Sequence, residues 1–345
     1  GAVMLPTRAR LRPEPRLPIR LMGRALLLIV MVALVATSSW AALNLSEAEV
    51  FELANGMTVA VLEEPTLPVV SVQMLYKMGA RNEEIGRTGL AHFLEHMAFR
   101  ATESFPQTEV VSAIYAVGGE WHGYTWIDQT TYFETPPREH PDLARRIESE
   151  RMAHLPIPES QVEAERGAVL SELHGYENDP GTVLLDAVAA ASFSQHPYRH
   201  NTIGWQSDVE RLEHADLVDF YRRHYQPANA VLAVVGDIRV EDVRSRVTEL
   251  FASHEERPAT DSVRTVEPLQ RGERRIRIEG RGGRLRFVWA YRAPEVGHVD
   301  WPGFLLLQEV LGGGEGVNFL QSDWGVAVRS GTRLEGVTED LSTWY

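Results

Sequence analysis

Cysteine is absent from the 345 residues of this chain. Its absence excludes disulfide bonds, thiolate metal ligands and cysteine nucleophiles, so any metal must be bound by histidine or carboxylate side chains. Basic residues are also scarce beside acidic ones, 34 against 48, which gives a formal net charge of −14. Nucleic-acid binding requires clustered Lys and Arg on one face, so this balance argues against a nucleic-acid partner.

Long hydrophobic runs are scarce as well. The longest apolar run, residues 25–36, follows Arg24 and precedes small residues. It is shorter than a membrane span requires and is typical of a secretory signal peptide. We therefore expect residues 1–41 to be a signal peptide with an upstream extension, cleaved after Ala41 to give a periplasmic or secreted protein with no stable membrane span. An uncleaved N-terminal membrane anchor is the alternative.

From residue 46 onward, strand-like and helical patterns alternate and predict an α+β fold. Period-two alternation predicts strands over 57–64 and 69–79, and a short buried strand over 229–237. Residues 118–137 carry Trp, Tyr, Thr and Phe at strand spacing, and the stretches between these strands have helical periodicity, including one over 207–224.

The pattern restarts after a polar stretch that contains two prolines, residues 256–270, which we interpret as a linker. We expect an N-terminal domain over 46–255 and a partial C-terminal domain over 271–345. In the latter, the sequence predicts strands near 273–280 and 284–292, followed by an apolar helix at 300–311.

The stretch "GLAHFLEHMAFR" (89–100) contains two histidines and a glutamate within five positions. His92 and His96 are four apart, so on a helix they lie on one face and can offer two imidazole nitrogens to one ion. Glu95 flanks that face and could touch a water molecule bound to the ion. A catalytic zinc takes three protein ligands and keeps an open position for water, so a third ligand is needed.

The best candidates for the third ligand lie in a carboxylate-rich helix, residues 159–178. Glu165 and Glu172 are seven apart, two turns, and therefore share a face. Glu172 stands between Leu170 and Leu173, which favours its pointing toward the interior, and Glu165 could hold His96 or Glu172 by a hydrogen bond. Spacing alone leaves the polar edge of an amphipathic helix as the alternative, and imidazole and carboxylate ligands also suit other transition metals.

Five segments together resemble a known family: "GLAHFLEHMAFRAT", "GGEWHGYTWIDQTTYF", "EAERGAVLSEL", "HPYRHNTIGW" and "YQPANAVLAVVGD". They occur in this order in the inverzincin zinc peptidases, which include pitrilysin, insulin-degrading enzyme and the mitochondrial processing peptidase. The resemblance covers residues 48 to about 330 and points to a bacterial processing-peptidase-like member. It implies the mitochondrial-processing-peptidase-like metallohydrolase fold, with two similar α/β domains of which the second is truncated here.

The resemblance also implies roles for individual residues. His92, His96 and Glu172 match the zinc ligands, with 75 residues between His96 and Glu172. Glu95 matches the general base that activates the zinc-bound water, and Glu165 matches a second glutamate that supports the site.

Two positions depart from the family pattern. His122 and Gly123 stand where the family usually has an Asn-Ala pair that binds the substrate backbone, so they are candidate substrate-binding residues, with an ordinary exposed histidine as the alternative. Asn318 stands where an arginine is common. The Arg-Tyr pair of the family's second half is expected beyond residue 345.

The sequence therefore predicts a zinc-dependent metalloendopeptidase that hydrolyses peptides or unfolded protein segments, with one Zn²⁺ per active site. Related chains work in pairs, so we expect a dimer or a paired subunit. The alternative is a non-catalytic partner subunit of a paired peptidase. The presence of both histidines and both glutamates of the metal pattern argues against that alternative.

Overall fold

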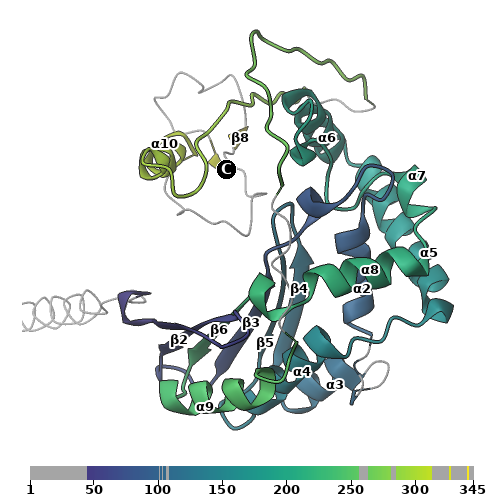
Figure 1. Cartoon of the computed structure of the whole chain (residues 1–345). Helices are drawn as coiled ribbons and strands as arrows, with labels where there is room; N and C mark the ends of the chain where they lie inside the picture. Colours follow the sequence, from purple (N-terminus) through teal and green to yellow (C-terminus); the bar gives the residue numbers. More distant parts are fainter. Residues whose placement is uncertain are drawn as a thin grey trace, which may run out of the picture.

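The computed structural model describes residues 45–100, 102, 104–105, 109–255, 263–280, 285–312, 326–327 and 340–341. The predicted signal peptide at 1–41 and the departure at Asn318 lie outside these described residues. The described part is organised around one mixed β-sheet with helices packed against it (Figure 1). No helix within it is long and apolar enough to cross a membrane.

Within the described residues the sheet has six strands in the order β1-β2-β6-β3-β5-β4, so β4 is an edge strand of this part. Neighbouring strands are antiparallel except for β2 and β6, which pair in parallel. The bounds are β1 Glu49–Glu52, β2 Thr58–Glu63, β3 Val70–Tyr76, β4 Glu120–Thr125, β5 Thr130–Thr135 and β6 Ala230–Gly236. A separate two-stranded pair joins β7 Val326–Ala327 to β8 Asp340–Leu341.

Alternation along the strands places one set of side chains beneath the helices. In β3, Val70, Val72, Met74 and Tyr76 are buried, whereas Gln73 between them is exposed. Successive side chains of a strand point to opposite faces of a sheet, so this pattern buries one face and leaves the other more open. Helices α2, α4 and α9 contact the sheet.

Helices fill most of the chain between the strands. Their bounds are α2 Leu90–Ala98, α3 Glu109–Ala116, α4 Pro141–Ala153, α5 Glu159–Glu177, α6 Pro180–Ser192, α7 Gln206–Val209, α8 His214–His224, α9 Val240–Phe251 and α10 Trp301–Gly312. Short 3₁₀ turns are η1 Leu45–Glu47, η2 Ala80–Asn82, η3 Pro197–Arg199 and η4 Pro227–Asn229. The single helix predicted over 207–224 is divided, because Glu213 forms a capping box with Asp216 and starts α8 afresh.

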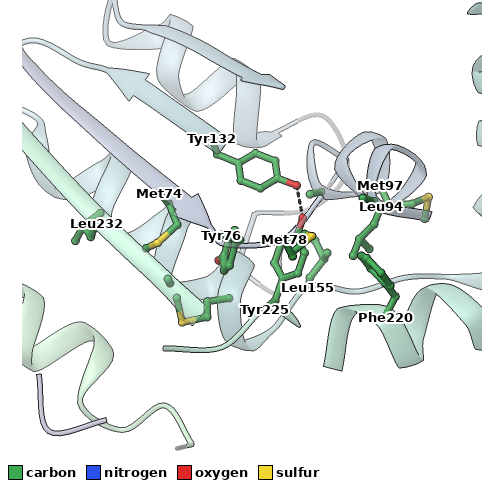
Figure 2. Packing of buried hydrophobic residues seen from close by; sticks show 14 of the residues in the cluster. Met74, Tyr76, Met78, Leu94, Met97, Tyr132, Leu155, Phe220, Tyr225 and Leu232 are labelled. Carbon is green, nitrogen blue, oxygen red and sulfur yellow. Dashed lines mark hydrogen bonds between the residues drawn. The ribbon is translucent and has the colours of Figure 1, made fainter. Parts of the chain in front are cut away.

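A cluster of buried aromatic and methionine side chains joins the sheet to the helices (Figure 2). The hydroxyl groups of Tyr132 in β5 and Tyr225 after α8 lie 2.5 Å apart. The rings of Tyr76 and Tyr225 lie 4.2 Å apart. These contacts link residues distant in sequence, so α8 and the sheet form one core.

The two strands predicted after the linker are wrong for the described residues. Residues 271–280 and 285–295 form no strand, and their apolar side chains Ile276, Trp289 and Tyr291 are exposed. A strand is stable only when a neighbour satisfies its backbone groups, and no described segment pairs with either stretch. The helix predicted at 300–311 is present as α10.

Candidate metal centre

The centre is built on α2, which runs beside the edge of the sheet formed by β4 and β5. His92 and His96 lie one turn apart on this helix, with their ring centroids 4.6 Å from each other. His92 and Glu95 are buried and His96 is half-buried. The local geometry of a helix therefore places two imidazoles side by side, as their spacing predicts.

Glu172 of α5 completes a group of three. Its Oε2 lies 3.6 Å from His92 Nε2 and 3.4 Å from His96 Nε2. These separations are longer than good hydrogen bonds. They match the ligand-to-ligand distance of about 3.4 Å that follows from tetrahedral zinc with bonds of about 2.0–2.2 Å. His92, His96 and Glu172 therefore fit a zinc ion in both donor type and spacing.

Glu165 lies two turns before Glu172 on α5 and orients the second imidazole. Its Oε1 lies 2.9 Å from Nδ1 of His96, which leaves Nε2 of that ring directed toward Glu172. The guanidinium of Arg100 contacts the other carboxylate oxygen. Burial opposes ionisation of Glu165, but His96 and Arg100 outweigh it and lower the pKa of the Glu165 carboxyl. Such a partner fixes the tautomer and orientation of a ligating histidine.

Glu95 occupies a different environment from His92, His96 and Glu172. Thr125 of β4 donates a hydrogen bond of 3.1 Å to its Oε2. Burial raises the pKa of Glu95, although His96 and the Thr125 hydroxyl oppose that rise. A carboxylate with a raised pKa beside a metal centre is suited to accept and release a proton.

The two histidines differ in their own protonation. Burial, with His96 nearby, lowers the pKa of His92 to about 4, so His92 is a neutral imidazole at pH 7. Burial also acts to lower the pKa of His96, but the adjacent carboxylates of Glu165 and Glu172 outweigh it and raise the pKa to about 9. The described residues provide no hydrogen-bond partner for Nδ1 of His92.

His122 and Gly123 lie on β4, the edge strand, and as successive residues of a strand they face opposite sides of the sheet. His122 stacks on Phe133 of β5, with ring centroids 5.4 Å apart and 8° between the planes. A Cβ on Gly123 would lie 2.3 Å from Phe99 Cζ, so this position faces α2. The structure therefore does not bring the His122 ring into the metal group.

Three contributors are missing from the sequence prediction: Thr125, Arg100 and Glu83. Arg100 is four residues after His96, so its helical spacing was available in the sequence. Thr125 and Glu83 reach α2 from β4 and from the turn after η2. No spacing rule connects them to α2, because tertiary packing alone brings them there.

This fold and this His-His-Glu group define the class: a metallopeptidase-like α+β protein with an inverted His-x-x-Glu-His sequence. The family model of the insulinase peptidases, family M16, matches residues 58–205, and the model of the M16 inactive domain matches 211–336. The chain belongs to the insulinase family, peptidase family M16. The predicted family and fold class are thereby confirmed, and all the candidate metal residues lie within 58–205.

Similar proteins include the zinc protease PqqE of Helicobacter pylori, 30% identical over 88% of this chain and 69% of that protein. The probable mitochondrial-processing peptidase subunit beta of Arabidopsis thaliana is 28% identical over 64% of this chain and 41% of that protein. A crystal structure of a protease from Helicobacter pylori superposes with a TM-score of 0.62 at 30% identity, covering 64% of this chain and 54% of that one. The chain thus spans about half the length of several relatives it matches.

Proposed function

We propose that this chain carries the catalytic centre of a zinc-dependent metalloendopeptidase, with His92, His96 and Glu172 as ligands. The observation that carries the proposal is the Glu172 carboxylate, 3.4 and 3.6 Å from two imidazole nitrogens, at separations that suit a shared ion better than hydrogen bonds. Zinc bound by these residues would supply Lewis-acid polarisation of the scissile carbonyl and would lower the pKa of a water molecule.

Glu95 is the general base of the proposed reaction. The Thr125 hydroxyl engages Oε2, which leaves Oε1 to take the proton from the attacking water. The water oxygen bonds to the carbonyl carbon, the carbon–nitrogen bond breaks, and Glu95 returns the proton to the leaving amine. Glu165 acts through His96, whose imidazole it keeps aimed at the ion.

The proposed substrate is a peptide or an unfolded protein segment. In the sheet of the described residues β4 is the edge strand, so an extended peptide can add to it by main-chain hydrogen bonds. His122 and Gly123 on this strand stay candidate substrate-binding residues. A dimer or paired subunit, a signal peptide and a periplasmic or secreted location also stay predictions, as do the domain limits 46–255, 256–270 and 271–345.

The test compares Glu95→Gln with the matched control Glu84→Gln, an exposed glutamate of the loop before α2. Glu95→Gln should lower kcat on a quenched fluorescent peptide at least about 10²-fold, because it removes the proton acceptor. Its zinc content by metal analysis should equal that of the wild type, since Glu95 is not a ligand. Full turnover in Glu95→Gln refutes the mechanism.

A non-catalytic partner subunit is the second candidate function. The match of residues 211–336 to the inactive-domain model favours it. Metal analysis separates the two: a peptidase binds one zinc per chain and loses activity with a chelator, whereas a degenerate partner binds none. If the chain is a peptidase, replacement of His92 by alanine should abolish its zinc binding. A degenerate partner has no zinc binding to lose.

A further inference from the structure

The N-terminus of the metal-binding helix is capped by a side chain from outside the helix. The N-cap residue of α2 is Gly89, with φ of +91°, and it has no side chain to accept from the first backbone N–H groups. The buried side chain of Glu83 takes the part of the missing N-cap side chain. Its two carboxylate oxygens accept from the N–H of Gly89 and the N–H of Ala91, both at 2.8 Å.

The residues on either side of Gly89 pack closely and are anchored to neighbouring segments. A Cβ on Gly89 would lie 2.6 Å from the carbonyl oxygen of Ile203, so the 203–205 segment packs closely against the start of the helix. Thr88 is bound through both its N–H and its hydroxyl to Asp208, at 3.1 and 2.8 Å. Asp208 thus anchors the residue before the N-cap, and Glu83 anchors the N-cap residue and the second residue of the helix.

His92 depends on this helix end more than His96 does. The Nδ1 atom of His96 lies 2.9 Å from Glu165, which orients its ring. The Nδ1 atom of His92 is buried and has no hydrogen-bond partner among the described residues. The position of the His92 ring is therefore set by packing and by where α2 begins. His92 directly follows Ala91, whose N–H donates to Glu83.

We propose that Glu83 is a positioning residue for the metal centre, which fixes the start of α2 and thereby places His92 Nε2 opposite His96 and Glu172. Its relation to His92 parallels that of Glu165 to His96, but it acts through the backbone instead of through the ring. The inference rests on the proposed metal site, although its main readouts need no peptidase activity. Glu83 lies outside the helical spacing that relates His92 to His96, so the sequence pattern does not reveal its role.

The experiment measures metal binding by Glu83→Ala and Glu83→Gln. Glutamine keeps one acceptor oxygen and turns an amide NH₂ toward the second backbone N–H, so it retains half of the cap. We expect Glu83→Ala to weaken Zn²⁺ binding about 10–100-fold in chelator competition, as substitutions of residues that hold metal ligands in place typically do. Glu83→Gln should weaken it less. With Co²⁺ in place of zinc, the visible absorption bands should shift in both variants, because the ligand geometry changes.

Two controls separate positioning from general stability. Glu84→Gln removes the adjacent, exposed carboxylate and should leave Zn²⁺ binding and the Co²⁺ spectrum unchanged. Val247→Ala removes buried volume in α9, away from the centre, and should lower the melting temperature without changing either metal readout. On a peptide substrate, the Glu83 variants should lose kcat with little change in KM.

Zn²⁺ affinity and Co²⁺ spectra within twofold of wild type in both Glu83 variants would overturn the inference, even if their melting temperature fell as in Val247→Ala. If Glu83→Ala does not fold, Glu83→Gln decides the matter by the same readouts. Absence of zinc binding by the wild type would instead refute the proposed function itself, and this inference with it.

Discussion

A methyl group added at Gly123 of β4 would meet the ring of Phe99 directly. A Cβ there would lie 2.3 Å from Cζ and 3.0 Å from Cε2 of Phe99, the residue that ends α2. Phe99 cannot easily yield, because its ring lies 4.6 Å from that of Trp121 and 5.4 Å from that of Tyr132. Overpacking of this kind costs about 1–3 kcal/mol. Replacing glycine also stabilises by about 0.4–1 kcal/mol through the unfolded chain.

We therefore expect Gly123→Ala to lower the free energy of unfolding by about 1–2 kcal/mol, a fall of about 2–8 °C in melting temperature for a domain of this size. Circular dichroism at 222 nm during heating measures it. Gly167→Ala is the control, because that glycine lies in α5 with nothing within 4 Å of its would-be Cβ, and it should stabilise by about 0.5–1 kcal/mol.

A double-mutant cycle with Phe99→Leu tests the cause. Leucine shortens the side chain that the new methyl group meets, so the double variant should be more stable than the sum of the two single changes predicts. Strict additivity, or a Gly123→Ala chain as stable as the wild type, would refute the assigned contact. It would also show that alanine, usual at this position in the family, fits here without adjustment.

Two further predictions concern buried charges. His224 of α8 is buried without a hydrogen-bond partner among the described residues, and burial lowers its pKa to about 4. The unfolded chain takes up this proton below pH 6.5, so stability should fall by up to about 3 kcal/mol as the pH drops from 6.5 to 4, as measured by urea unfolding. His224→Gln should lose less of its free energy of unfolding than the wild type between pH 7 and 5. An equally steep loss contradicts the assignment of the pH dependence to His224. Arg151 is fully buried between Glu134 and Glu148, so Arg151→Met should cost about 3–5 kcal/mol. Replacing both glutamates by glutamine in the same chain should restore part of the lost stability. If no stability is restored, uncompensated charge is not the cause.

The metal group could be predicted from the sequence because it depends on helical spacing. Residues four or seven apart on a helix share a face wherever the helix lies, so His92 with His96, and Glu165 with Glu172, follow from local geometry. What spacing could not supply was the approach of α5 to α2. The sequence favours Glu172 as the inward-facing candidate, with Glu165 as its supporting partner, and the resemblance to the family assigns the same roles; in the structure they reach different nitrogens of His96.

Strands depend on neighbours in a way that helices do not. The sequence predicts strands over both 229–237 and 273–280, yet among the described residues only the first forms one, because β2 and β3 lie on either side of β6. Its pairing with β2 joins Thr58 to Val231, residues far apart in the chain. A helix satisfies its own backbone hydrogen bonds, so α10 forms without such partners. The same distinction applies to the site: the shared face of His92 and His96 on α2 follows from the sequence, whereas Glu83 and Thr125 reach α2 from other elements and are recognised only in the fold.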